Sequence, residues 1–188
     1  ELVREIISVT KKIKKSYEII FVDDGSADKT YRVITSLAGK NKNIKAFRLR
    51  GNFGKSIALS IGFSRAKANI IFTLDGDLQD NPKEIPLFLK KIDEGYDLVS
   101  GWKKKRYDPV TKTFPSKVGN TITRILTGVR IHDLNCGFKA YRKAVIKNLN
   151  LHGELYKFIP IIAYKQNFKI TEVVVEHRPR VFGKSKFG

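Results

Sequence analysis

Apolar and polar residues alternate along the chain with two different periods. Short apolar runs rich in Ile, Val and Phe are typical of buried strands, and between them apolar residues recur at the spacing of amphipathic helices. Before residue 101 this pattern predicts strands at 17–22, 44–49, 68–74 and 97–100, and helices at 2–15, 28–38, 55–66 and 82–91. Such an order predicts an α/β fold with a largely parallel sheet and right-handed crossovers.

The alternation becomes irregular after residue 100. Residues 101–117 form a long loop with six Lys or Arg side chains, and a loop of this length in a compact domain is usually functional or disordered. Further along we expect helices at 118–126, 142–149 and 155–165, a turn into a strand at 133–141, a strand at 169–175 and a basic tail at 177–188. No repeat or boundary interrupts the pattern, so residues 1–188 are predicted to form a single domain.

The composition narrows the class of protein. The 188 residues carry 37 Lys and Arg against 18 Asp and Glu, a formal net charge of +19. This charge suits nucleic acid, an anionic membrane, phosphorylated ligands or simply a solvated surface. One cysteine excludes an internal disulfide, and no apolar run reaches the roughly 20 residues that span a bilayer. No methionine occurs, and the first residues resemble the middle of a helix, so we expect the natural start to lie before residue 1.

Two acidic clusters stand out against this basic background. Asp23 and Asp24 follow the first predicted strand, and Asp75 and Asp77 follow the third. The carboxyl ends of parallel strands meet at one edge of a sheet, where open α/β folds bind their ligands. Carboxylates gathered among so many cations suggest a divalent metal ion together with a phosphate-bearing ligand.

Each cluster also has a simpler interpretation. Asp75 and Asp77, with Gln79 as a neutral oxygen donor, suit a metal held to a pyrophosphate, but Asp and Gly are also common in surface turns. Asp23 or Asp24 suits recognition of a nucleoside, or the segment is a turn that caps the next helix. The shared position of both clusters at strand ends favours the functional interpretation.

Other polar residues are weaker candidates. Asp133 lies in a polar segment and suits either a general base or a turn. Cys136 is interpreted as a small buried residue rather than a nucleophile. The tail offers cations and a hydroxyl that could wrap phosphate oxygens. These residues are Arg180, Lys184, Ser185 and Lys186. The three histidines show neither metal-ligand spacing nor an evident partner; they are His132, His152 and His177.

Taken together, these segments resemble the family 2 inverting glycosyltransferases of GT-A fold, and most closely their polyprenyl-phosphate sugar transferase branch, which is dolichol-phosphate mannosyltransferase-like. The resemblance covers nearly the whole chain, and the order of the segments makes it specific although no single segment is. The matching segments are 22–30 (VDDGSADKT), 50–55 (RGNFGK), 74–82 (LDGDLQDNP), 133–141 (DLNCGFKAY), 153–160 (GELYKFIP) and 180–186 (RVFGKSK).

The resemblance implies a three-layer, Rossmann-like GT-A fold with a mostly parallel central sheet, and it implies roles for the candidate residues. The donor nucleotide would be bound by Asp23, Asp24, Lys55 and Asp75. Mg²⁺ or Mn²⁺ would be bound by Asp75, Asp77 and Gln79. The catalytic residues would be Asp77 and Asp133. Phosphates would be bound by Arg180, Lys184, Ser185 and Lys186. The basic residues 103–106 would meet the lipid phosphate at an anionic membrane surface.

The resemblance also implies features beyond this chain. Relatives open with a strand and a turn that helps to bind the base, and the chain starts after that point, so we expect a sheet that lacks its first strand. Many relatives carry C-terminal transmembrane helices. We therefore expect a peripheral domain at the cytoplasmic face of a membrane, within a full-length protein that has such helices.

The implied reaction is transfer of a sugar, with inversion, from a UDP- or GDP-sugar to a polyprenyl or dolichyl phosphate. A phosphate monoester has a second pKa of about 6, so the acceptor needs little help from a general base, and orienting the acceptor is as good a role for Asp133. Two alternatives stay open. A response-regulator receiver domain also has Asp at strand ends, but its Lys-Pro pair is absent here. A basic nucleic-acid-binding module explains the charge, but it does not need the Asp75 cluster, and we expect no nucleic acid partner.

Overall fold

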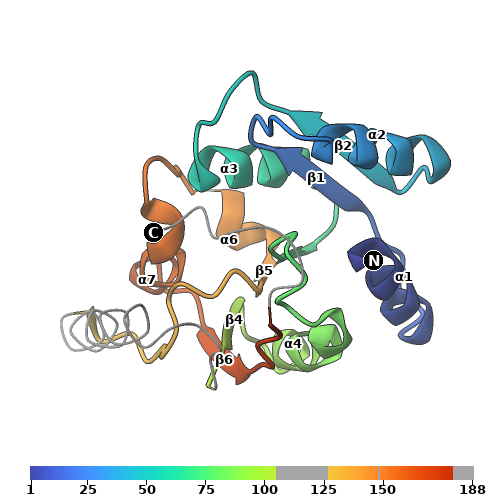
Figure 1. The fold of residues 1–188 in the computed structure, drawn as a ribbon. Coiled ribbons are helices and arrows are strands. Elements are labelled where there is room, and N and C mark those ends of the chain that lie inside the picture. The colour runs from blue at the N-terminus through green and yellow to red at the C-terminus, as the bar shows by residue number, and fades with distance from the viewer. Residues whose placement is uncertain (105–126, 148, 180–188) are drawn as a thin grey trace.

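The strands of the computed structural model form two separate sheets, and the structure describes residues 1–104, 127–147 and 149–179 (Figure 1). A two-stranded parallel sheet contains β1 (Ile19–Asp23) and β2 (Ile44–Arg48). A four-stranded sheet has the order β3-β5-β4-β6, with β3 at Ile70–Thr73, β5 at Lys139–Arg142, β4 at Leu98–Trp102 and β6 at Ile170–Val174. Because β1 does not pair with β3, the continuous sheet expected from the sequence is divided into two parts.

The helices lie close to their predicted positions. Those before β4 are α1 (Leu2–Lys12), α2 (Thr30–Lys40), α3 (Lys55–Arg65), the 3-10 turn η1 (Pro82–Glu84) and α4 (Ile85–Asp93). Those after β5 are α6 (Lys143–Lys147), the 3-10 turn η2 (Leu155–Phe158) and α7 (Ile159–Lys165). Among the described residues, no helix combines the length and the apolar character that a membrane crossing requires.

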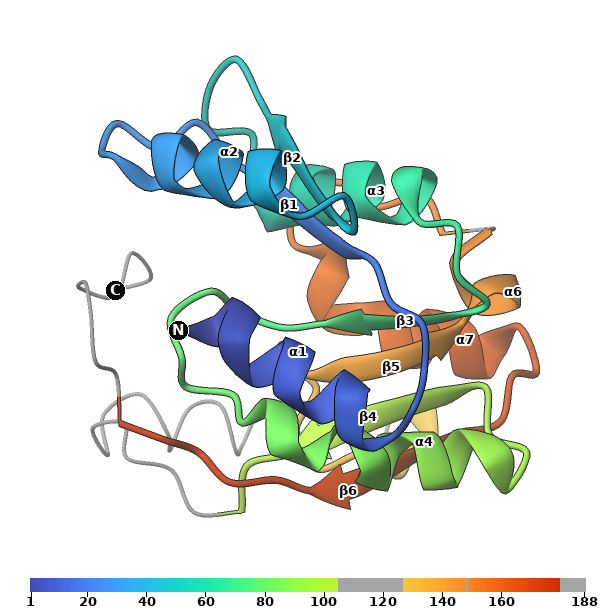
Figure 2. The same cartoon turned by 90° about the vertical axis from the view of Figure 1, so that its right-hand side faces the viewer.

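Strand direction decides which segments meet at the edge of the larger sheet. β5 runs antiparallel to both β3 and β4, and β6 runs parallel to β4. β3, β4 and β6 therefore point the same way, which agrees with the predicted mostly parallel sheet. Their carboxyl ends share one edge with the amino end of β5, at the left in Figure 2. Segments that follow β3 and precede β5 are consequently neighbours.

Helices cover both faces of the four-stranded sheet, so the chain has the three layers of an α/β fold (Figure 2). On one face, α1 and α4 pack against β4 and β5 around Phe88 and Phe138, whose rings stack with centroids 4.3 Å apart. On the other face, α3, α6 and α7 pack around Leu98 and Tyr141. The alternation along β4, with Leu98 on one face and Val99 on the other, is what a strand buried on both sides requires.

Candidate functional site

The acidic loop, residues 75–81, follows β3 and lies at the edge where β3, β4 and β6 end (Figure 2). The Asp75 carboxylate accepts a hydrogen bond from the Lys55 ammonium, with Oδ1 and Nζ 2.6 Å apart. Burial raises the pKa of this carboxyl, but the attraction of nearby ammonium groups, those of Lys55, Lys103 and Lys139, outweighs burial and lowers the pKa. The loop therefore begins with a carboxylate that is held ionised by surrounding lysines.

Gly137 leaves the space that the Asp75 carboxylate occupies. It precedes β5, and its carbonyl accepts a hydrogen bond from the Thr73 hydroxyl at the end of β3, 2.7 Å away. A Cβ at position 137 would lie 2.5 Å from Oδ2 of Asp75, which is shorter than a non-bonded contact allows. The glycine of the 133–141 segment thus determines where the first carboxylate of the acidic loop can lie.

The middle of the acidic loop is a tight turn at Leu78, whose φ is 66°. This left-handed conformation is uncommon for a bulky residue. The N–H of Gln79 donates to Oδ1 of Asp77 at 3.1 Å, and the C=O of Gln79 accepts from the N–H of Arg178 at 3.0 Å. The loop is therefore fastened both to itself and to the segment that follows β6.

His177 is a site residue that the sequence analysis missed. Its Nε2 lies 3.0 Å from Nε2 of Gln79, and its side chain is buried. The two residues are 98 positions apart, so no local spacing could connect them. Together with Asp75 and Asp77, Gln79 gives carboxylate and carboxamide oxygens that suit Mg²⁺ or Mn²⁺, and the His177 imidazole adds a nitrogen group of the kind that transition metals take.

These groups do not yet form a closed metal site. In residues 1–104, 127–147 and 149–179, no three His, Cys, Asp or Glu side chains surround a common point. The Asp75 carboxylate contacts Lys55, and the Asp77 carboxylate accepts from the backbone of its own loop. The residues nevertheless fit Mg²⁺, because this ion usually takes only one or two carboxylates and completes its shell with phosphate oxygens and water.

The Lys103 side chain is only 11% exposed and is paired inside the protein, so its predicted place on a membrane-facing surface is wrong. Its Nζ lies 2.8 Å from Oδ1 of the buried Asp80, whose Oδ2 accepts from the N–H of Asp75 at 3.3 Å. β4 continues to Trp102 instead of ending at residue 100, and the next side chain turns inward. Burial lowers the pKa of Lys103, but attraction to Asp80 outweighs it and raises the pKa. Lys104 is exposed, with its Nζ 5.7 Å from the centre of the Trp102 ring.

Asp133 lies inside the molecule, with 2% of its surface exposed. Its carbonyl accepts from the hydroxyl of Ser100 on β4, 3.5 Å away. Lys139 is also buried, and its ammonium donates to the carbonyls of Leu134, at 3.1 Å, and of Cys136. Burial lowers the pKa of Lys139, although attraction to Cys136 and Asp133 opposes this effect. The Asp133 carboxylate is therefore within electrostatic reach of an internal cation that holds the same segment together.

The first acidic cluster makes contacts within the protein. The Asp23 carboxylate is buried, with Oδ2 3.4 Å from Nε of Arg48. The Asp24 carboxylate accepts from the N–H of Phe53 at 2.7 Å and from that of Gly54 at 2.9 Å. Asp24 thereby fixes the turn that leads into α3, and so the position of the lysine that opens this helix.

His132 also has partners that the sequence did not indicate. Its ring stacks on Trp102 with centroids 4.1 Å apart, and both its N–H and its Nδ1 contact the Glu172 carboxylate. These contacts bind the segment before Asp133 to β4 and β6. The remaining predicted residues lie outside the described residues, namely Lys105, Arg106, the 118–126 helix, Arg180, Lys184, Ser185 and Lys186.

Cys136 is expected to be inert in the folded protein, as its interpretation as a buried residue implied. The thiol is buried, and burial raises its pKa to about 12. Because the thiolate is the reactive form, Ellman's reagent should label Cys136 only after denaturation. Rapid stoichiometric labelling of the native protein would contradict this expectation.

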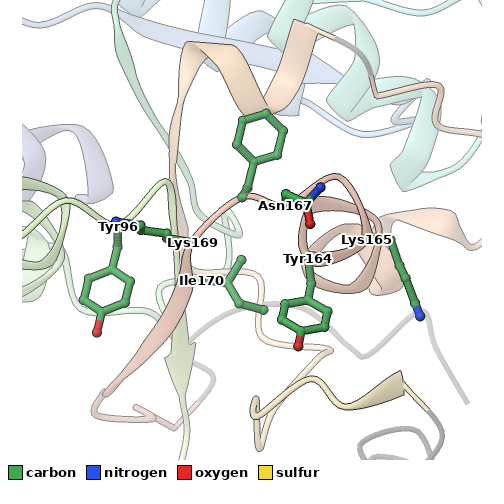
Figure 3. Close-up of a pocket in the computed structure, with 7 residues that line it drawn as sticks. Tyr96, Tyr164, Lys165, Asn167, Lys169 and Ile170 are labelled. Carbon is green, nitrogen blue, oxygen red and sulfur yellow. The ribbon is translucent and has the colours of Figure 1, made fainter.

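A separate hollow of about 520 Å³ lies at the opposite edge of the four-stranded sheet (Figure 3). It is lined by Tyr96, Tyr164, Lys165, Asn167, Phe168, Lys169 and Ile170. These residues surround the amino ends of β4 and β6, whereas the acidic loop lies at the carboxyl ends. The hollow is therefore not part of the site.

Comparisons with known proteins show what the chain is similar to. Residues 1–149 match the family model "Glycosyl transferase family 2". The chain is 34% identical over 189 residues to the undecaprenyl-phosphate 4-deoxy-4-formamido-L-arabinose transferase of Shewanella sediminis, and all of the chain covers 57% of that protein. It is also 34% identical over 192 residues to the dodecaprenyl-phosphate galacturonate synthase of Rhizobium johnstonii, with the same coverage. The chain thus spans a little over half the length of these relatives.

Solved structures support the predicted GT-A fold. Glucosyl-3-phosphoglycerate synthase from Mycobacterium tuberculosis superposes with a TM-score of 0.69 at 19% identity, over 93% of this chain and 66% of that one. A crystal structure of that synthase in complex with Mn²⁺ and UDP-glucose superposes with a TM-score of 0.62 at 18% identity, over 94% and 68% of the two chains. The likeness confirms the GT-A fold that the family resemblance implied and the α/β class that the pattern of strands and helices predicted.

Proposed function

Because the chain belongs to glycosyl transferase family 2, we propose that it transfers a sugar from a UDP- or GDP-sugar to a polyprenyl phosphate, with inversion and with a bound divalent metal. Family membership removes the receiver-domain alternative. The named relatives support the acceptor class. The observation that carries the proposal is the convergence at one sheet edge of Lys55, Asp75, Asp77, Gln79 and His177.

The donor diphosphate would lie against the acidic loop. Asp75 and Asp77, with Gln79 and His177, would hold Mg²⁺ or Mn²⁺, which when bound neutralises negative charge on the leaving diphosphate. Lys55, now paired with Asp75, adds a positive charge at the same place. The nucleoside would lie near the turn fixed by Asp24. Asp23 stays a predicted contact of the donor. The basic tail residues stay predicted contacts of its phosphates; they are Arg180, Lys184 and Lys186.

The acceptor needs a binding surface more than it needs a base. An oxygen of the lipid phosphate forms a bond to the anomeric carbon while the bond from that carbon to the donor diphosphate breaks, and one such displacement inverts the centre. The phosphate is already largely dianionic at neutral pH. Asp133 is buried beside Lys139, which supports a part in shaping the acceptor side; its role as a general base stays a prediction. The lipid acceptor would place the protein against the cytoplasmic face of a membrane.

Nucleotide binding is expected to depend on metal. The change is removal of Mn²⁺ by EDTA, and calorimetry with UDP and with GDP measures the result on the complete protein. We expect binding with Mn²⁺ and a loss of at least about tenfold in affinity without it, since a diphosphate next to two carboxylates is repelled unless a cation neutralises them. Equal affinity in EDTA would remove the metal from the proposal. Formation of lipid-linked sugar from a donor panel and a short polyprenyl phosphate then tests the reaction itself.

A further inference from the structure

The segment that follows β6 crosses the acidic loop, and we call its residues 175–178 the strap. Its first N–H, of Val175, donates to the carbonyl of Trp102 and so extends the β4–β6 pairing. The N–H of Glu176 then donates to the Glu84 carboxylate at 2.9 Å, and its own carboxylate accepts from the Asn81 amide at 2.8 Å. The strap is thus bound to the end of the acidic loop and to η1.

The strap also contacts the strained centre of the acidic loop. The N–H of Arg178 donates to the C=O of Gln79 at 3.0 Å, and the His177 ring lies 3.0 Å from the Gln79 amide. Leu78, just before, has the left-handed φ of 66°. Such a conformation costs free energy and persists where its surroundings hold it. The strap therefore supplies part of what holds the loop in the shape that directs Asp75 and Asp77.

An ion pair anchors the strap to a helix far away in the sequence. Nη1 of Arg178 lies 2.9 Å from Oε2 and 3.2 Å from Oε1 of Glu5, in the first turn of α1. The two side chains are only 23% and 20% exposed. The neighbouring pair on the same helix, Arg4 with Glu1, is 3.9 Å apart and 86% and 57% exposed. Partly buried charges at hydrogen-bonding distance fix geometry far better than exposed ones do.

We propose that Glu5 and Arg178 are positioning residues that hold the acidic loop in its metal-binding shape through the strap. Figure 2 shows why α1 can act as the anchor, since the loop between β3 and α4 passes beside the first turn of this helix. α1 is itself held by packing, because Val9 enters the core beside Phe88 and Ile92. The inference rests on the proposed function for its metal, but its contacts are those of this chain alone.

The test compares five variants of the complete protein with wild type. Arg178→Met and Glu5→Gln each remove one charge of the pair, and the exchanged pair Glu5→Arg with Arg178→Glu restores opposite charges. Arg4→Met removes an exposed charge from the same helix. Val3→Ala loosens α1 through a different cluster, where Val3 packs with Ile19 and Ile44. The readouts are Mn²⁺ affinity by electron paramagnetic resonance, hydrogen exchange of a peptide covering residues 75–81, and thermal stability.

We expect Arg178→Met and Glu5→Gln to weaken Mn²⁺ binding by about tenfold, the usual effect of losing a group that orients a metal ligand, and to speed exchange in the 75–81 peptide. The exchanged pair should recover most of both effects, though not all, because an arginine in the first turn of a helix opposes the helix dipole. Arg4→Met should change neither readout. Val3→Ala should lower thermal stability without a comparable change in Mn²⁺ affinity or in hydrogen exchange of the 75–81 peptide.

Two results would overturn the proposal. The first is hydrogen exchange of the 75–81 peptide in Arg178→Met that is no faster than in wild type, or no faster than in Val3→Ala at matched stability. The second is a charge-swapped pair whose Mn²⁺ affinity and hydrogen exchange are no closer to wild type than those of the single variants. If wild type binds no Mn²⁺ at all, the proposed function fails, and the exchange data still decide whether the ion pair holds the loop.

Discussion

Replacing Asp77 by Asn is expected to lower sugar transfer by at least about a hundredfold, the scale of other losses of an electrostatic catalytic group, with little change in stability. Asn keeps the volume of the side chain and an Oδ1 that can accept the 3.1 Å hydrogen bond from Gln79. The shape of the acidic loop should therefore survive while its metal-binding charge is lost. The measurement is the initial rate of lipid-linked sugar formation across a Mn²⁺ series.

A matched control is Asp93→Asn, which removes one negative charge from an exposed position at the end of α4. It should transfer sugar at the wild-type rate. If Asp77→Asn also stays within a few-fold of wild type, Asp77 is not a metal ligand. A loss of activity accompanied by a large fall in thermal stability would instead assign Asp77 to the structure of the loop.

Gly137→Ala is expected to have an effect of similar size although it adds only a methyl group. The new Cβ would lie 2.5 Å from Oδ2 and 2.9 Å from Cγ of Asp75, so the carboxylate must move away. Displacing a group of the reaction site by about 1 Å can cost about a hundredfold in rate. We expect this loss in transfer, together with weaker Mn²⁺ binding, in a protein that still folds because the carboxylate is partly exposed and can shift.

Gly39→Ala is the control for adding a methyl group. Gly39 lies in α2, and a Cβ there would meet nothing within 4 Å, so Ala should keep activity and raise stability slightly. Transfer by Gly137→Ala within a few-fold of wild type would show that the Asp75 carboxylate is not confined as the structure indicates. Loss of folded protein for Gly137→Ala would instead show that the Asp75 carboxylate cannot shift to make room for the methyl group.

The regular part of the fold was predictable because local pattern determined it. The apolar runs that form β1, β2 and β3 are each visible within about ten residues of sequence. The same is true of the apolar faces of helices α2 and α4. The place of each acidic cluster at the end of a strand was predictable for the same reason, but the two clusters lie at strands of different sheets. Both predictions needed only the order of the elements and the polarity of the residue that ends each strand.

The contacts that complete the site depend on distant pairs and were not predictable. His177 reaches Gln79 across 98 positions, so its ring looked isolated in the sequence. Lys103 stands in a run of cations that suggested a surface, but the extra length of β4 and the buried Asp80 turn it inward. Gly137 looked like an ordinary turn residue, since its importance comes from the Asp75 carboxylate in the loop after β3. In each case a tertiary contact outweighs the local pattern.

The position of β5 between β3 and β4 has a consequence for how the protein folds during synthesis. β3 and β4 do not pair with each other; both pair with β5, which begins at Lys139. During synthesis both strands emerge long before the strand that joins them, so this sheet closes by non-local pairing, which is slow compared with local pairing. A nascent chain that stops before Lys139 leaves β3 and β4 without their pairing partners, and unpaired strand edges are prone to aggregation. Assembly of the sheet edge that carries Asp75 is therefore a late event in folding.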